Sequence, residues 1–190
     1  MERAEDDIKK AKWQEINCLE AEVILKLPED WNRPKDEVIA KKFPYISKPQ
    51  EIFADLQGKK IITFNLLDKQ LVDEQVYPAI KEMQRLINRL YPEGIRKEAG
   101  LFKVEAGIGM SGRFMFITGG MEYDTAHCMF ILPVNERMMF GSYHFPFEEI
   151  AEEEAVLLDI LRSICVISST EDEAENYERT GIHRQHNTRT

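Results

Sequence analysis

The sequence predicts one α+β domain in which a mainly antiparallel sheet is covered by helices on both faces. Four strand-like runs follow one another over 101–147, separated by glycine-rich or Pro-Asn turns, which is typical of an antiparallel meander. Apolar residues are consecutive inside these runs, as over 114–117, so both faces of the strands are apolar and must be covered. Two amphipathic segments, one before and one after the runs, can supply the covering helices.

The N-terminal segments come first. Residues 3–17 are charged nearly all round, which predicts a lightly docked helix, and we therefore expect 1–19 to be a helical extension. AEVILKLPEDW (21–31) predicts a strand closed by its proline. DEVIAKKF (36–43) predicts a second short strand, and KKIITFNLL (59–67) a third.

The two helices have different signatures. Over 74–91 an apolar stripe recurs at steps of three and four residues, and Pro92 and Gly94 stop the helix. The last helix is expected over about 147–167, with glutamates at its start, where the helix dipole favours negative charge. Beyond it the chain is polar, so we expect a single domain over 20–167 and a disordered tail over 168–190.

Composition excludes several classes of protein. The net charge of -9 argues against a nucleic-acid binder, which needs a dense basic face. Neither a signal peptide nor a run of about 18 apolar residues occurs, so we expect no membrane span. The cysteines are odd in number and widely spaced, which fits a reducing cytoplasm. The sequence leaves the oligomeric state open.

The order of these elements resembles a known family. Strands that open on LPEDW, a central helix, a meander and a closing helix LLDILRSI after FGSYHFPF are similar to the PsbP/DcrB-like fold, which a Ran-binding nuclear import factor shares. The resemblance covers about 20–167. It implies an accessory or binding protein rather than an enzyme, and it assigns no functional residues to this chain.

The stretch GIGMSG (107–112) has the G-x-G-x-x-G spacing of dinucleotide-binding loops. Such a loop needs a helix directly after the glycines, because the N-terminus of that helix holds the pyrophosphate. RFMFIT follows instead and predicts a strand. We therefore interpret the glycines as a turn or a close backbone approach in the meander, and we expect no cofactor.

Two histidines form the most specific candidate site. If Asn135 and Glu136 are a two-residue hairpin turn, His127 faces His144 across the hairpin. A one-residue change in the turn can pair His127 with Tyr143 instead. A facing histidine pair is a candidate metal site, although no third ligand is evident, and partly buried histidines with local hydrogen bonds are the alternative.

We expect structural roles, rather than chemical ones, for the cysteines, most of the methionines and the glutamate pairs. Cys128 and Cys165 are expected to be small hydrophobic residues, in a covered strand and in the closing helix respectively. Five of the six methionines in the meander are expected to fill the core. The pairs at i,i+4 near the start of the last helix, including Glu149 with Glu153, are expected to face solvent and complement the helix dipole.

Four residues are candidate partner contacts. Met121 and Tyr123 lie in the segment GGMEYDTAHC, which is expected to leave them at an exposed loop. Phe43 and Tyr45 lie in the proline-containing connection FPYISKPQEIF, for which the alternative is an irregular edge packed on the core.

Three functional classes follow. The leading hypothesis is a non-enzymatic cytoplasmic domain that binds a protein or a small ligand. The alternative is a hydrolase-type or metal-assisted enzyme that uses His127 and His144 in a pocket beside the meander. A third is a regulatory partner whose acidic helix, at Glu152 and Glu153, mimics an anionic ligand.

Overall fold

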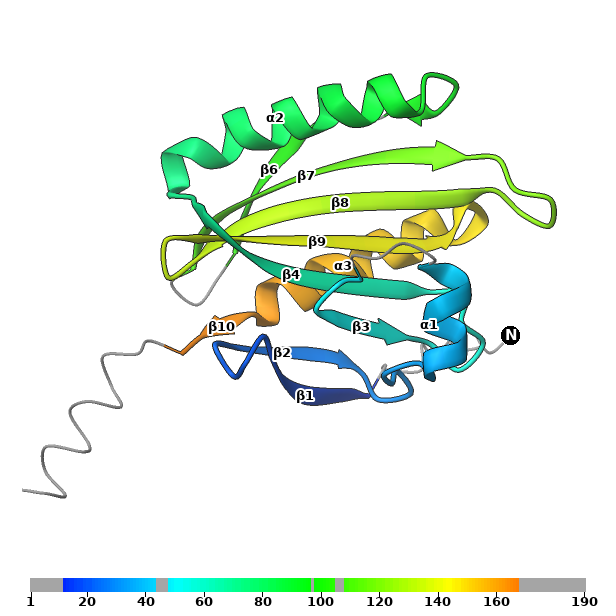
Figure 1. The fold of residues 1–190 in the computed structure, drawn as a ribbon, viewed down its shortest axis with the longest axis horizontal. Coiled ribbons are helices and arrows are strands. Elements are labelled where there is room, and N and C mark those ends of the chain that lie inside the picture. The colour runs from blue at the N-terminus through cyan, green and yellow to red at the C-terminus, as the bar shows by residue number, and fades with distance from the viewer. Residues whose placement is uncertain (1–11, 44–47, 97, 105–107, 168–190) are drawn as a thin grey trace, which may run out of the picture.

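The computed structural model describes residues 12–43, 48–96, 98–104 and 108–167, which form two sheets and three α-helices (Figure 1). The larger sheet consists of β3 (Glu51–Ala54), β4 (Ile61–Gln70), β5 (Ile95–Arg96), β6 (Gly100–Val104), β7 (Gly109–Thr118), β8 (Thr125–Val134) and β9 (Arg137–Pro146). The smaller sheet consists of β1 (Trp13–Cys18), β2 (Val23–Pro28) and β10 (Cys165–Val166). The helices are α1 (Asp36–Lys42), α2 (Asp73–Leu90) and α3 (Ile150–Ser163), with the short 3₁₀ helix η1 (Phe147–Glu149) before α3.

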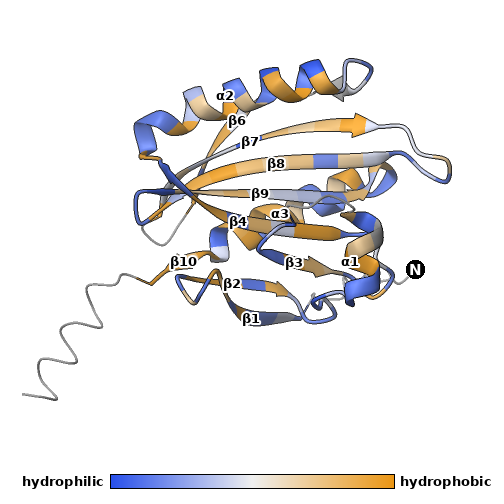
Figure 2. Ribbon diagram, in the orientation of Figure 1, coloured by the Kyte–Doolittle hydropathy of each residue, from blue (hydrophilic) through white to orange (hydrophobic). Residues whose placement is uncertain are grey.

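The larger sheet is antiparallel in every described pairing, in the order β3-β4-β9-β8-β7-β5, with β6 also paired to β7. β7, β8 and β9 are joined in sequence as the predicted meander, and most of β7 and β8 is apolar (Figure 2). Successive side chains of a strand point to opposite faces, so both faces bury apolar residues.

Each face of the larger sheet has its own cover (Figure 1). On one, which we call the α2 face, Val76 and Ile80 of α2 pack against Phe114, Phe116 and Ile131. On the other, the α3 face, α3 and the smaller sheet enclose the main core, whose largest fully buried side chains include Tyr143, Phe64, Phe130, Phe145, Leu25 and Leu27. The predicted fold class, an antiparallel sheet covered by helices on both faces, is confirmed.

α1 covers a separate part of the α2 face. Ile39 and Phe43 pack against Ile61 of β4 and its β3 neighbours. Ile61 and Thr63 alternate along β4 with residues of the main core, so they point to the α2 face. Between α1 and α2, part of the α2 face therefore belongs to neither of the two apolar clusters.

Two predicted elements were wrong. A strand, β1, occupies part of the expected N-terminal helix, because its backbone pairs with β2 along six residues and Trp13 and Ile16 pack at the edge of the main core. The expected strand over 36–43 is the helix α1. Ile39 and Phe43 lie four apart and reach one apolar face only in a helix, which begins with acidic residues in its first turn.

The closing helix is shorter than predicted. α3 ends at Ser163, and Cys165 and Val166 pair antiparallel with β2 instead. Cys165 is consequently exposed in β10 rather than buried in a helix, whereas Cys128 is buried as expected. The predicted disordered tail lies outside the described residues.

The glycines of GIGMSG are explained by packing. Gly109 opens β7 with φ of 79°, a conformation that side chains disfavour. A Cβ at Gly112 would lie 3.0 Å from side-chain atoms of both Val76 and Ile80, so this glycine lets α2 approach the sheet. The interpretation as a close backbone approach is confirmed, and Gly107 lies outside the described residues.

No helix in the described part of the chain is both long and apolar enough to cross a membrane.

Candidate functional site

The hairpin that joins β8 to β9 has the predicted register. Asn135 and Glu136 form its two-residue turn, with φ of 48° and 60°, as type I′ turns require. His127 pairs with His144, and their Nδ1 atoms lie 2.7 Å apart. The predicted pairing of the two histidines is therefore confirmed, and the distance is that of a hydrogen bond between the rings.

This histidine pair is the centre of a longer chain of hydrogen bonds. His127 Nε2 lies 2.7 Å from Thr118 Oγ1, and His144 Nε2 lies 2.8 Å from Ser142 Oγ. Ser142 Oγ is 2.8 Å from Thr63 Oγ1. The five side chains, which we call the histidine chain, cross four adjacent strands, β7, β8, β9 and β4, on the α2 face.

Burial keeps both rings neutral at pH 7. Loss of solvation lowers the pKa of His127 from 6.5 to about 4. Loss of solvation, the nearby His127 and the positive charge of Lys42 lower the pKa of His144 to about 3. A neutral imidazole has one N–H donor and one acceptor nitrogen, so the histidine chain runs in one direction at a time.

The ring nitrogens of His127 and His144 already have partners in the larger sheet. All four ring nitrogens are hydrogen-bonded within the sheet. A zinc ion between the Nδ1 atoms would need them roughly 3.3 Å apart, given Zn–N bonds of about 2.0–2.1 Å and tetrahedral angles. Among the described residues no group of three or more His, Cys, Asp or Glu is arranged to hold a metal. A metal at His127 and His144 stays a prediction, which zinc titration by calorimetry tests.

The predicted partner contacts divide into two kinds. Met121 is fully exposed in the β7–β8 loop. Tyr123 is partly buried and lines a hollow of about 450 Å³ together with residues of α1 and of the β3–β4 turn. Phe43 is partly buried against β3 and β4, which agrees with the alternative interpretation of this segment as an edge packed on the core. Tyr45 lies outside the described residues.

A second hollow adjoins the one at Tyr123. It has a volume of about 340 Å³, and its lining includes Leu56, which is 80% exposed in the β3–β4 turn. The two hollows share Val38, Gln57 and Gly58. We give the name α1-end surface to four apolar residues of this region: the exposed Val38, Leu56 and Met121, and the partly buried Tyr123.

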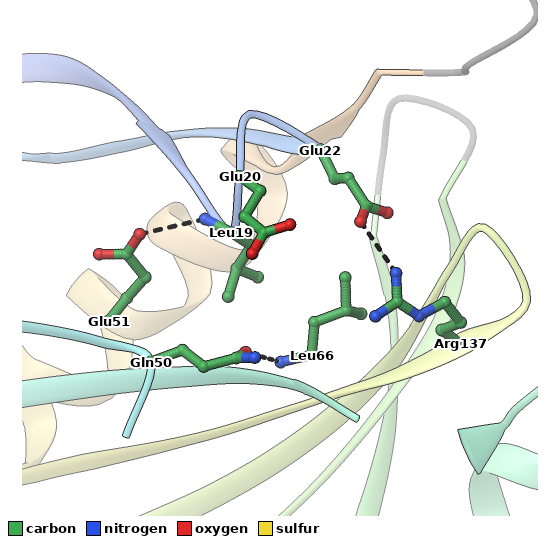
Figure 3. Close-up of a pocket in the computed structure, with 7 residues that line it drawn as sticks. All are labelled: Leu19, Glu20, Glu22, Gln50, Glu51, Leu66 and Arg137. Carbon is green, nitrogen blue, oxygen red and sulfur yellow. Dashed lines mark hydrogen bonds and ion pairs between the residues drawn. The ribbon is translucent and has the colours of Figure 1, made fainter. Parts of the chain in front are cut away.

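A cavity of about 270 Å³ lies between the β1–β2 turn and the larger sheet (Figure 3). Its charged groups are largely paired, because Glu22 contacts Arg137 at 2.9 Å and Glu51 accepts a hydrogen bond from the Leu19 amide at 3.2 Å. Leu19 and the next two residues have φ between 53° and 66°, and these bonds hold that left-handed turn against the sheet. We interpret the cavity as a structural junction of the two sheets.

The α3 face contains a buried charged cluster that the sequence interpretation missed. Glu153, expected to face solvent, is 4% exposed. Its carboxylate accepts hydrogen bonds from Tyr143 and Lys60, and Lys60 also contacts Glu149 at 2.7 Å. Glu153 lies three residues after Ile150 and four before Leu157, a spacing that places it on the inward stripe of α3. The third hypothesis required an accessible Glu153 and is not supported by this burial.

Loss of solvation, the largest single effect, lowers the pKa of Lys60, but hydrogen bonds and charge attraction from Glu149 and Glu153 together raise it to about 12. Burial, with the negative charge of Glu153, raises the pKa of Tyr143 well above 10. The lysine therefore stays charged and the tyrosine stays protonated at neutral pH.

Comparison with known proteins shows the fold. No protein-family model and no curated protein sequence matches this chain. The solution structure of cyanobacterial PsbP from Synechocystis sp. PCC 6803 has a TM-score of 0.55 at 8% identity, over 85% of this chain and 96% of that one. The crystal structure of the Saccharomyces cerevisiae Ran-binding protein Mog1p has a TM-score of 0.50 at 11% identity, over 84% and 98%. The chain is thus similar in fold to PsbP and Mog1p, as the sequence resemblance implied.

Proposed function

We propose that this chain is a non-enzymatic binding domain that contacts another protein through the α1-end surface. The observation that carries the proposal is the convergence of apolar side chains from three separate segments on two adjoining hollows. Val38 of α1 lines both hollows, Leu56 of the β3–β4 turn lines one of them, and Tyr123 of the β7–β8 loop lines the other. Met121, two residues before Tyr123, is fully exposed. Two adjoining hollows lie among these segments, and adjoining apolar side chains and hollows are typical of interaction sites.

The arrangement of the histidine chain favours binding over catalysis. General acid–base catalysis requires a side chain within hydrogen-bond reach of the substrate, and every ring nitrogen of His127 and His144 is already engaged inside the sheet. One fold neighbour is described as a Ran-binding protein, and we extend protein binding, without its partner, to this chain as part of the proposal. A reducing cytoplasm is also proposed, supported by the three cysteines, none of which forms a disulfide.

Substitution at the α1-end surface tests the proposal. Leu56→Asp places a charge on an 80% exposed side chain, so the fold should be unaffected. Leu86→Asp is the matched control, because Leu86 is 51% exposed on α2, outside the α1-end surface. Cross-linking in source cells, with quantitative mass spectrometry, compares both variants with the wild type.

We expect one protein to be cross-linked by the wild type and by Leu86→Asp and to be lost with Leu56→Asp. Equal capture by the wild type and Leu56→Asp would contradict the α1-end surface as the binding site. Recovery of no protein by the wild type, or recovery only of a second copy of this chain, would contradict the proposal of a distinct protein partner.

A further inference from the structure

A separate cavity lies where α2 ends above the last residues of β7. It has a volume of about 290 Å³, near the lower end of the range for small-molecule sites. Leu90, Tyr91 and Pro92 line one side, and Ile117 and Thr118 the other. Leu90, the last residue of α2, is 63% exposed. The cavity is mostly apolar and lies outside the α1-end surface.

A row of packed rings begins at Tyr91 in the cavity wall. The Tyr91 ring lies 5.3 Å from the ring of Phe116, and Phe116 stacks on His127 with ring centres 4.6 Å apart. Gly94 closes the turn after α2, where a Cβ would lie 3.1 Å from the Ile117 carbonyl oxygen. The walls are therefore held by packed rings and by backbone, as a preformed ligand site requires.

The histidine chain ends at the cavity wall. Thr118 is partly buried, lines the cavity and lies 2.7 Å from His127 Nε2. Among the described residues that line the cavity, Glu93 is the one with a charge. The site thus combines apolar walls, one hydroxyl connected to a buried polar chain and one carboxylate that disfavours anions.

The direction of the histidine chain decides what Thr118 offers to a ligand. When the Thr118 hydroxyl donates to His127 Nε2, its oxygen is left to accept, and His127 carries its proton on Nδ1. When His127 Nε2–H donates to Thr118, the hydroxyl proton is free to point at a ligand. Both arrangements satisfy the same four contacts and leave both rings neutral.

We propose that this cavity binds a neutral aromatic ring bearing one hydrogen-bonding oxygen, and that the histidine chain reverses its direction to match a donor or an acceptor on that ring. The ring contacts Leu90, Tyr91 and Pro92, and its oxygen contacts Thr118. The ring can belong to a free small molecule or to a tyrosine side chain of a peptide, which share this chemistry.

Nuclear magnetic resonance with simple probes tests the proposal. Phenol, whose hydroxyl is a stronger donor than acceptor, and acetophenone, which only accepts, are titrated separately into the full chain. N-acetyltyrosine amide represents a peptide side chain. We expect shifts confined to residues 90–94 and 117–119, with dissociation constants on the order of millimolar. Stronger binding of N-acetyltyrosine amide than of phenol would assign the ring to a peptide, and the reverse to a free molecule. Absence of shifts at these residues with all three probes would overturn the site.

Isosteric variants identify the hydroxyl. Thr118→Val should weaken phenol binding about five- to tenfold, because one hydrogen bond is lost while the wall is kept. Thr125→Val is the matched control, since Thr125 is the cross-strand partner of Thr118 and is outside the histidine chain. Unchanged binding in Thr118→Val, or an equal loss in both variants, would contradict a role for Thr118.

The ring nitrogens of His127 report the direction of the chain. We expect phenol to shift the ¹⁵N signals toward the tautomer protonated on Nδ1, and acetophenone toward that protonated on Nε2. The same change with both probes would overturn the reversal. This readout separates a working hydrogen-bond chain from one that is only structural, because a fixed chain responds to neither probe.

Discussion

The two faces of the larger sheet bury polar groups in opposite ways. Tyr143 and His144 are neighbours on β9, and their side chains point to opposite faces. On the α3 face Tyr143 joins a charged cluster with Glu153 and Lys60. On the α2 face His144 joins the neutral histidine chain. One strand therefore presents an ionic network and a neutral hydrogen-bond chain from adjacent residues.

The difference separates a cluster closed by its own partners from a chain whose end lines a cavity. The carboxylate of Glu153 is enclosed by its partners, and removal of one would leave a buried charge without compensation. The histidine chain has no net charge to compensate, and its Thr118 end lines a cavity. Each contact of the charged cluster has one possible direction, whereas the neutral chain can keep all of its contacts in either proton arrangement.

Loss of the buried ion pair should produce the largest effect. Lys60→Met removes the positive partner of Glu153, and we expect a loss of about 3 kcal/mol in the free energy of unfolding. Urea denaturation measures it. Lys59→Met, at the exposed neighbouring position, should change stability by less than about 0.5 kcal/mol. Equal stability of Lys60→Met and the wild type would show that the buried carboxylate of Glu153 does not require Lys60 for its stabilisation.

Acid should destabilise the protein through His127 on the α2 face. The pKa of His127 is about 4 in the folded chain and 6.5 in the unfolded one, so the unfolded state takes up the proton first. This contribution to stability is fully present above pH 6.5 and is lost as the pH falls through about 4. Between pH 7 and pH 4.5, we expect the free energy of unfolding to fall by about 2 kcal/mol more in the wild type than in His127→Gln. Parallel pH profiles would contradict the desolvated histidine.

Alkali should affect the α3 face, since Tyr143 and Lys60 both have pKa values raised by their environment. Their contributions are present below about pH 10 and are lost as the pH rises toward 12. Tyr143→Phe should lower stability by about 1–2 kcal/mol at pH 7, through the lost hydrogen bond to Glu153, and should flatten the alkaline limb of the profile. An unchanged alkaline limb would assign that sensitivity to other groups.

The smallest effect is expected at the far end of the histidine chain. Thr63→Val keeps the shape of the side chain and removes one neutral hydrogen bond to Ser142, which should cost about 0.5–1 kcal/mol. Thermal or urea unfolding measures it. A cost as large as that of Lys60→Met would remove the distinction between the neutral and the charged system.

The sequence was sufficient where local rules fix the geometry. The pairing of His127 with His144 follows from a two-residue turn and the alternation of a strand, so it was predictable once the turn was assigned. The burial of Glu153 was predictable in principle from its helical spacing between Ile150 and Leu157. We expected it to be exposed because glutamates are rarely buried.

By itself, the sequence determined the meander, the two covering helices and the fold class, because strand alternation and helical periodicity are properties of neighbouring residues. Tertiary structure decided that residues 13–18 pair with β2 as a strand, that Glu153 meets Lys60 of β4, and that Thr118 of β7 lies beside the end of α2. These contacts join segments far apart in the chain, and their energies depend on burial and on partners that no local pattern encodes.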